Sequence, residues 1–252
     1  MNHDEEGSDL DDVTAAADFA DLSRELMTEL EEQPTLQAVV DRAVAMIPAV
    51  DSCSVTLRRR RNRLETLASS SPLALECDQL QYALNEGPCV DAVWQDDSYL
   101  VEDVTKETRW PRWAARVAEG GIGSILAIRL SNDDETIGAL NMYAVRANAF
   151  TTDDVDLALI FTTHAANALN SARMVTGLRT AMHSRHLIGV AQGILMARFD
   201  LDLDRSFKLL QRYSSETNTK LREVAEYVVG NRDLPDRNGE PQGLPSQREV
   251  LD

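Results

Sequence analysis

Basic and polar side chains that could contact a nucleic acid gather near the C-terminal end of the chain. Residues 172–230 contain nine lysines and arginines and six acids, a net charge of +3 in a chain whose total is −17. The remaining residues therefore carry −20. Charge segregated in this way favours a phosphate backbone as the partner of this stretch, although a solvated helix face explains the same residues without any partner.

Helical periodicity predicts how these side chains are positioned. Apolar residues recur at helical spacing from Leu178 to Phe199, which indicates one long helix that ends near Asp200. Asp202 can cap a second helix, and Asn218 can cap a third. Three such helices can close over a small shared core of about 50 residues.

The segment SRHLIGVAQGILMARFDLDLDRSFKLL, followed by SSETNTKLREVAEYVV, resembles the ANTAR domain. ANTAR domains are small helical RNA-binding output modules of bacterial transcription antitermination regulators. The motif AQGILM at residues 191–196 accounts for much of this resemblance. One departure is Gln192, where many relatives carry lysine, so the resemblance implies a weaker and uncharged contact there.

The resemblance implies a target, which is a pair of small stem-loops in a nascent leader transcript. Holding that structure prevents formation of the terminator hairpin. Unstacked loop bases can be read by a protein, while arginine and lysine hold the phosphates. Gly193 would permit close approach of the RNA, or else close packing against the second helix. The expected RNA contacts are Arg185, Gln192, Gly193, Arg212, Ser215, Asn218, Lys220 and Arg222.

A second group of candidate residues lies earlier in the chain. Pro88 can begin a short helix after a turn at Gly87, which directs Cys89 and Trp94 toward one side. A thiol at a helix N-terminus can have a lowered pKa and sense oxidants, but a buried cysteine is simply a small hydrophobe, and we favour the second interpretation. The candidate sensor pocket consists of Cys89, Trp94, Trp110 and Trp113, although tryptophans are more often core or pocket wall than ligand stacks.

The elements around this pocket are expected to form an antiparallel sheet with helices packed against it. Alternation predicts a half-buried strand over residues 52–57, a polar turn, and a second strand near 64–68. Helices are expected over 73–84 and from the stretch 108–113 through 117. Two further strands, 124–130 and 137–144, are joined by a short turn and must therefore be antiparallel.

This order of elements resembles a GAF domain over about residues 34–170. The resemblance includes the motifs GPC-x-DA, RWP and IGALN-x-Y. The likeness is greatest to the version that precedes ANTAR modules in bacterial two-domain regulators. GAF domains are small-molecule or redox sensors, so the resemblance implies an unknown signal of one of these kinds. It identifies no ligand, and no cofactor is predicted.

A helix that starts at Thr151 is expected to link the two modules. A threonine of the pair Thr151–Thr152 can cap it, with Asp153 and Asp154 in the first turn. A heptad seam then predicts that two copies meet in parallel as a homodimer, while a helix packed on its own sheet is the rival explanation. The seam residues are Leu157, Phe161, His164, Ala168, Ser171, Val175, Leu178 and Met182.

The predicted fold is thus an α/β GAF sensor domain joined by a long, coiled-coil-like helix to an all-α three-helix ANTAR bundle. The expected parts are a disordered acidic tail over 1–12, a GAF domain with N-terminal helices over 13–170, a linking helix over 155–185, an ANTAR domain over 171–230 and a disordered tail over 231–252. Three cysteines without CxxC spacing favour a reducing cytoplasm, and no apolar run is long enough for a membrane span.

Other functions receive less support from the residues. No phosphate-binding loop, nucleophile elbow or kinase motif is present, so no enzymatic activity is expected. His183 and His186 lie three apart on a helix but have no third ligand nearby, so no metal site is predicted. The alternative is a GAF-controlled DNA-binding helix-turn-helix regulator, which the acidic turn 200–202 disfavours. The run Arg58–Arg61 could contact RNA, although a strand end exposes charge in any case.

Overall fold

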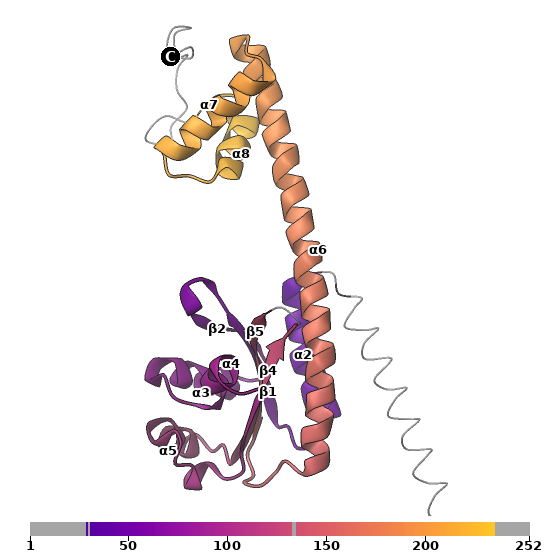
Figure 1. Ribbon diagram of the computed structural model, residues 1–252, viewed down its shortest axis with the longest axis vertical. Helices are drawn as coiled ribbons and strands as arrows, with labels where there is room; N and C mark the ends of the chain where they lie inside the picture. Colours follow the sequence, from indigo (N-terminus) through magenta and orange to yellow (C-terminus); the bar gives the residue numbers. More distant parts are fainter. Residues whose placement is uncertain (1–28, 30, 133–134, 235–252) are drawn as a thin grey trace, which may run out of the picture. The chain divides into compact units, whose positions relative to one another are not determined.

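The computed structural model describes residues 29, 31–132 and 135–234 (Figure 1). The chain divides into two compact units between Thr176 and Gly177. We call them the N-terminal unit and the C-terminal bundle. Helix α6, Thr152–Phe199, contributes its first half to the N-terminal unit and its second half to the bundle.

The N-terminal unit is built on one antiparallel sheet of five strands in the order β2-β1-β5-β4-β3. The predicted hairpins are confirmed. The edge strand β3 was not predicted, because its four residues are too few to show a clear alternation. The strands are β1 Ser52–Arg58, β2 Leu64–Ser69, β3 Ser98–Val101, β4 Ser124–Ser131 and β5 Thr136–Ala144.

Helices cover both faces of this sheet, as Figure 1 shows. Helix α2, Glu32–Met46, and the first half of α6 pack on one face, against alternate strand residues such as Val55 and Leu140. Helices α3 (Pro72–Leu84), α4 (Pro88–Trp94) and α5 (Pro111–Glu119) cover the other face. Strand β1 is therefore buried on both faces, and the prediction of a half-buried strand is wrong.

Local capping interactions explain where several helices begin. Ser71 accepts a hydrogen bond from the Ala74 backbone N–H, and prolines occupy the first turn of α3, α4 and α5. Thr151 and Asp154 cap α6 reciprocally, each side chain accepting from the other residue's backbone N–H at 3.2 and 2.9 Å. The sequence-based start of this helix is confirmed.

The C-terminal bundle consists of the second half of α6, α7 (Leu203–Glu216) and α8 (Leu221–Asn231). Asp200 has a left-handed φ of 54° and ends α6. Asp202 caps α7 by accepting from the Arg205 N–H at 2.7 Å, as predicted. The shared core contains Ala191, Leu195, Leu209, Leu210, Val224, Ala225 and Val228.

Two details of the bundle differ from the sequence prediction. Asn218 does not cap α8. It has a left-handed φ of 51° just after α7, where the Thr219 N–H bonds the Ser214 carbonyl at 3.1 Å and completes a helix C-terminal motif. The bundle also continues past Gly230, because Leu234 is buried in its core and Asp233 pairs with Arg198 at 3.0 Å.

The heptad prediction on α6 is only partly consistent with the structure. Phe161 and Ala168 are buried in the core beneath the sheet, which matches the rival explanation for the first half of the helix. Leu178 and Met182 are 60% and 70% exposed. The predicted tail 1–12, the helix before residue 29 and the tail beyond residue 234 lie outside the described residues.

Candidate functional site

The predicted RNA contacts form two groups within the C-terminal bundle. Arg185, Gln192 and Gly193 lie on α6. The others lie between the last turns of α7 and the first turn of α8: Arg212, Ser215, Asn218, Lys220 and Arg222. Gln192 reaches the first turn of α7, and Ser215 lies twelve residues further along that helix, so about 18 Å of helix separates the groups.

The α7–α8 turn presents its polar side chains to solvent. Arg212, Ser215, Asn218 and Lys220 are exposed, and Arg222 is half-buried. Lys220 makes a long ion pair with Glu223, at 3.8 Å between the ammonium nitrogen and a carboxylate oxygen. Such an exposed pair is weak, so the lysine remains available to a phosphate.

Gln192 is used within the bundle. Its side-chain amide donates to the Leu203 carbonyl at 3.0 Å and to the Ser206 hydroxyl at 3.4 Å. These bonds hold the start of α7 against α6. An RNA contact by Gln192 would therefore use its amide oxygen, or would require these bonds to be exchanged.

Gly193 does not mark a close contact between helices. A Cβ atom built at this position meets no atom within 4 Å, apart from its own helix and neighbours. The interpretation as close packing against the second helix is therefore wrong. The surface at Gly193 is open, and close approach of RNA there stays a prediction. His183 and His186 are also exposed, and no metal-binding cluster is found in the described part of the chain.

A buried polar cluster that was not predicted from the sequence lies beneath α3 and α4 in the N-terminal unit. Its centre is Asp78, which has no solvent exposure. One Asp78 oxygen accepts from Tyr143 and from the Asn141 amide at 2.9 Å, and the other accepts from Thr66 at 2.8 Å. A signal was present in the sequence, since Asn141 interrupts the apolar run of β5.

The hydroxyl groups of two strands extend this cluster toward α4. Tyr82 bonds Thr56 and Thr66 at 2.7 and 2.8 Å, and Cys89 donates to Thr56 at 3.4 Å. The Cys89 N–H donates to Gln81 at 2.8 Å. A Cβ atom at Gly87 would lie 2.3 Å from the same Gln81 oxygen, so this bond requires glycine.

Burial controls protonation throughout the cluster. Burial raises the pKa of Asp78 to about 6, even though the hydrogen bonds to its carboxylate act in the opposite direction. Burial also raises the pKa of the Cys89 and Cys77 thiols to about 12, with the Asp78 charge adding to both. The alternative of Cys89 as a reactive thiol of lowered pKa is therefore wrong.

The residues of the predicted sensor pocket lie in separate environments. Cys89 is buried among small residues of β4 and β5, while Trp110 and Trp113 pack edge to face at 6.0 Å in the neighbouring core. Trp94 is 41% exposed, so it does not share a side of α4 with Cys89. Five residues of helix rotate the chain by about 140° beyond one full turn, which explains the separation.

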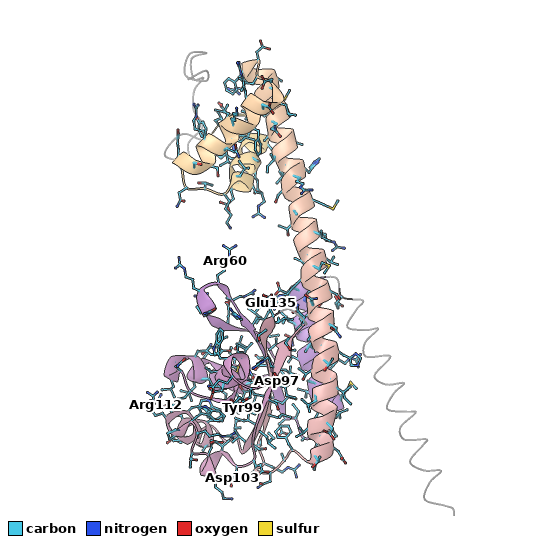
Figure 2. The ribbon with its side chains drawn as sticks, in the orientation of Figure 1. Arg60, Asp97, Tyr99, Asp103, Arg112 and Glu135 are labelled. Carbon is cyan, nitrogen blue, oxygen red and sulfur yellow. The ribbon has the colours of Figure 1, made fainter. Side chains whose placement is uncertain are left out.

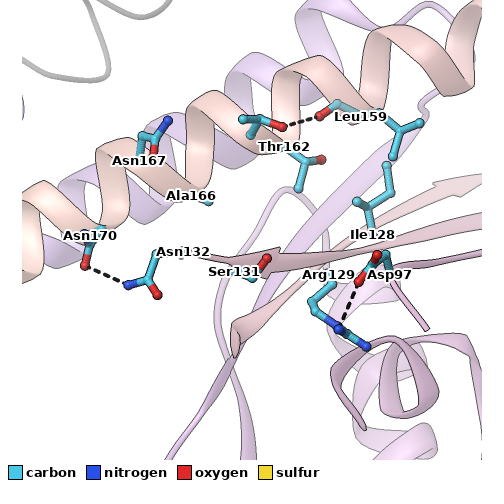
Figure 3. A pocket seen from close by; sticks show the side chains of 11 residues that line it. Asp97, Ile128, Arg129, Ser131, Asn132, Leu159, Thr162, Ala166, Asn167 and Asn170 are labelled. Carbon is cyan, nitrogen blue, oxygen red and sulfur yellow. Dashed lines mark hydrogen bonds and ion pairs between the residues drawn. The ribbon is translucent and has the colours of Figure 1, made fainter. Parts of the chain in front are cut away.

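A pocket of about 490 Å³ lies between β4 and the first half of α6, on the opposite face of the sheet (Figure 3). Asn132 donates to Asn170 across it at 3.3 Å, and the Arg129–Asp97 ion pair of 2.9 Å lies at its rim. Most of its other polar lining is uncharged: Ser131, Thr162, Thr163 and Asn167. Such amides and hydroxyls can bind a small polar molecule through hydrogen bonds.

Comparison with protein families identifies both units. A GAF domain model matches residues 29–170, more than half of the chain, and an ANTAR domain model matches residues 176–229. The chain belongs to the GAF–ANTAR proteins. GAF domains are sensor domains, and ANTAR domains are RNA-binding antitermination modules. The comparison with curated proteins found no relative that matches this chain.

The comparison with solved structures found chains similar to this GAF–ANTAR protein at low sequence identity. A bacteriophytochrome from R. palustris is similar with a TM-score of 0.57 at 8% identity, over 79% of this chain and 45% of that one. The GAF domain of an Acinetobacter phosphoenolpyruvate-protein phosphotransferase has 18% identity and a TM-score of 0.48, over 62% and 95% of the chains. No helix in the described part of the chain could span a membrane.

Proposed function

We propose that the ANTAR bundle binds paired stem-loops in leader transcripts and thereby prevents terminator hairpins from forming. The observation that carries this proposal is the exposed basic and polar turn between α7 and α8, within the segment that matches the ANTAR model. The side chains there include guanidinium and ammonium groups for phosphates, and hydroxyl and amide groups for unstacked bases.

The two groups of candidate contacts support a target with two contact points. About 18 Å of α7 separates the Gln192 end from the α7–α8 turn. A single loop base cannot reach both groups, whereas a stem-loop with its flanking backbone can. In this arrangement the turn holds phosphates and loop bases, and the open surface at Gly193 admits the RNA backbone.

We also propose that the protein acts as a parallel homodimer through α6. Met174, Leu178 and Met182 are 62%, 60% and 70% exposed and recur every four residues. Such a row of large apolar side chains is costly in water and is typical of a helix seam that a second copy covers. Two copies would present two bundles, one for each stem-loop.

The proposed signal of the GAF domain is a small molecule. The raised pKa values of Cys77 and Cys89 disfavour oxidation of these thiols as the signal. The pocket beside α6 supports a small, polar and largely uncharged ligand, because hydroxyl and amide groups dominate its polar lining. Binding there would act directly on the helix that continues into the bundle.

Binding of the full chain to a two-stem-loop leader RNA tests this function. Lys220→Ala/Arg222→Ala should weaken binding strongly, because it removes two cations from the α7–α8 turn. The matched control is Arg205→Ala/Lys208→Ala, which removes two exposed cations from the beginning and middle of α7. Equal losses in both variants would indicate a diffuse charge effect, and preference for duplex DNA would favour a helix-turn-helix regulator instead.

A further inference from the structure

A concentrated basic surface lies on the GAF domain, at the turn between β1 and β2. We call it the arginine hairpin and define it by Arg58, Arg59, Arg60, Arg61 and Arg63. Glu65 is the only acid between residues 58 and 65, so this hairpin carries a net charge of +4 in a chain of −17. Nothing in the ANTAR-based function uses it.

The hairpin residues differ in how they are paired. Arg59 is held by Glu65 at 3.3 Å and by Glu32 at 3.8 Å. Arg60, Arg61 and Arg63 are exposed, and their side chains make no ion pair or hydrogen bond with the described residues. Figure 2 shows Arg60 projecting away from the hairpin tip. Three guanidinium groups are therefore available to an anionic partner.

The backbone of the turn fixes this presentation. Arg61 and Asn62 both have left-handed φ values, of 61° and 58°. Arginine rarely adopts this conformation, whereas asparagine tolerates it. The Asn62 side chain accepts from the Arg58 guanidinium at 3.1 Å, and this bond ties the turn to the end of β1.

An exposed aromatic ring adjoins the arginines. The Arg58 guanidinium lies 5.0 Å from the centre of the Trp94 ring, and Trp94 is 41% exposed at the end of α4. Guanidinium planes and aromatic rings are the groups on which proteins stack unpaired bases. An acidic protein could pair with the arginines, but its carboxylates would gain little from an indole ring. The combination favours a nucleic-acid strand.

We propose that the arginine hairpin binds a single-stranded segment of the same RNA that the ANTAR bundle holds. Arg60, Arg61 and Arg63 contact its phosphates, and one base stacks on the Arg58–Trp94 pair. The contact is independent of sequence, because guanidinium–phosphate pairing and stacking read no base edge. This inference rests on the proposed RNA binding by the bundle, which identifies the strand as RNA.

The test compares two RNAs with the full-length protein by fluorescence anisotropy. One is the two-stem-loop RNA, and the other carries an added uridine extension of about ten nucleotides, within the length range of single-strand sites. The variant is Arg60→Gln/Arg63→Gln, which leaves the left-handed position 61 unchanged. The control, Arg116→Gln/Arg146→Gln, removes two exposed arginines elsewhere on the GAF domain.

We expect the extension to tighten binding by the wild-type protein and the hairpin variant to lose that gain. The variant loses two phosphate contacts on a single strand, so the slope of log affinity against log salt concentration should become shallower by about 1.4. This corresponds to about a tenfold loss of affinity at 0.15 M salt. Trp94→Leu should lower affinity for the extended RNA without changing the slope, and Trp94→Phe should restore it.

The inference is overturned if the hairpin variant and the control bind the extended RNA equally well, or if the hairpin variant loses as much on the unextended RNA. In either case, a persisting loss in Lys220→Ala/Arg222→Ala would leave the ANTAR function intact. Absence of RNA binding by the wild-type protein would instead contradict the proposed function itself.

Discussion

The GAF domain and the ANTAR bundle use polar residues in opposite ways. Beneath α3 and α4, the GAF domain buries a carboxyl, two amides and several hydroxyl groups with no solvent exposure, Asp78 and Asn141 among them. In the described part of the ANTAR bundle, the buried polar residues are Ser206 and Asp233. Most of its other polar side chains lie at least partly at the surface, around a small apolar core.

This difference predicts where each domain tolerates amino-acid substitutions. A buried polar network is stable only while each group keeps its partner, so one removed side chain leaves several donors unpaired. A polar surface over an apolar core can lose side chains with little effect on folding. We therefore expect substitutions in the GAF cluster to change stability, and substitutions in the ANTAR turn to change binding.

The largest expected effect is that of Asp78→Ala. It removes the acceptor for Tyr143, Asn141 and Thr66, and three unpaired donors should cost about 3–5 kcal/mol of unfolding free energy. All three tryptophans lie in the GAF domain, so denaturation followed by tryptophan fluorescence reports this domain alone. Glu119→Ala, at an exposed acid, is the control. Loss of less than about 1 kcal/mol would mean that the cluster is not tightly coupled.

The next largest effect concerns the α6 seam. Leu178→Glu/Met182→Glu places charges on the exposed apolar row and should weaken the proposed dimer at least about 100-fold, or about 2.7 kcal/mol. Sedimentation of the full chain over a concentration series measures this. Thr180→Glu/Ser184→Glu adds the same charges at the same spacing on another side of the helix. A wild-type protein that stays monomeric, or equal loss in both variants, would contradict the seam.

The protonation of Asp78 gives a smaller effect with a defined sign. Its pKa is about 6 in the folded state against 3.8 ordinarily, so the folded state binds the proton more tightly. This contribution to stability is complete below the ordinary pKa and is lost as pH rises through 6. Between pH 7 and pH 5, the GAF domain should gain about 1 kcal/mol relative to Asp78→Asn. Parallel stability profiles for the two proteins would refute this shift.

Sequence patterns could predict the helices and strands of this protein better than its buried hydrogen-bond cluster. Periodicity and capping residues indicated the hairpins, the start of α6 at Thr151 and the α7 cap at Asp202, because these depend on neighbouring residues. The Asp78 cluster joins α3 to β1, β2 and β5, and no local pattern encodes such pairing. Asn218 was assigned to the wrong helix end, since asparagine suits both an N-cap and a left-handed turn.

The smallest predicted effect tests whether the open surface of α6 has a binding role. Gly193→Ala should stabilise the bundle by about 0.8 kcal/mol, because the added Cβ meets open space and alanine favours a helix. The same methyl group should weaken binding of the two-stem-loop RNA if its backbone approaches the helix there. Gly189→Ala, one turn earlier and equally open, should stabilise without weakening binding. If both variants bind RNA as the wild-type protein does, Gly193 is not a contact, and the candidate RNA surface is reduced to the α7–α8 turn, Arg185 and Gln192.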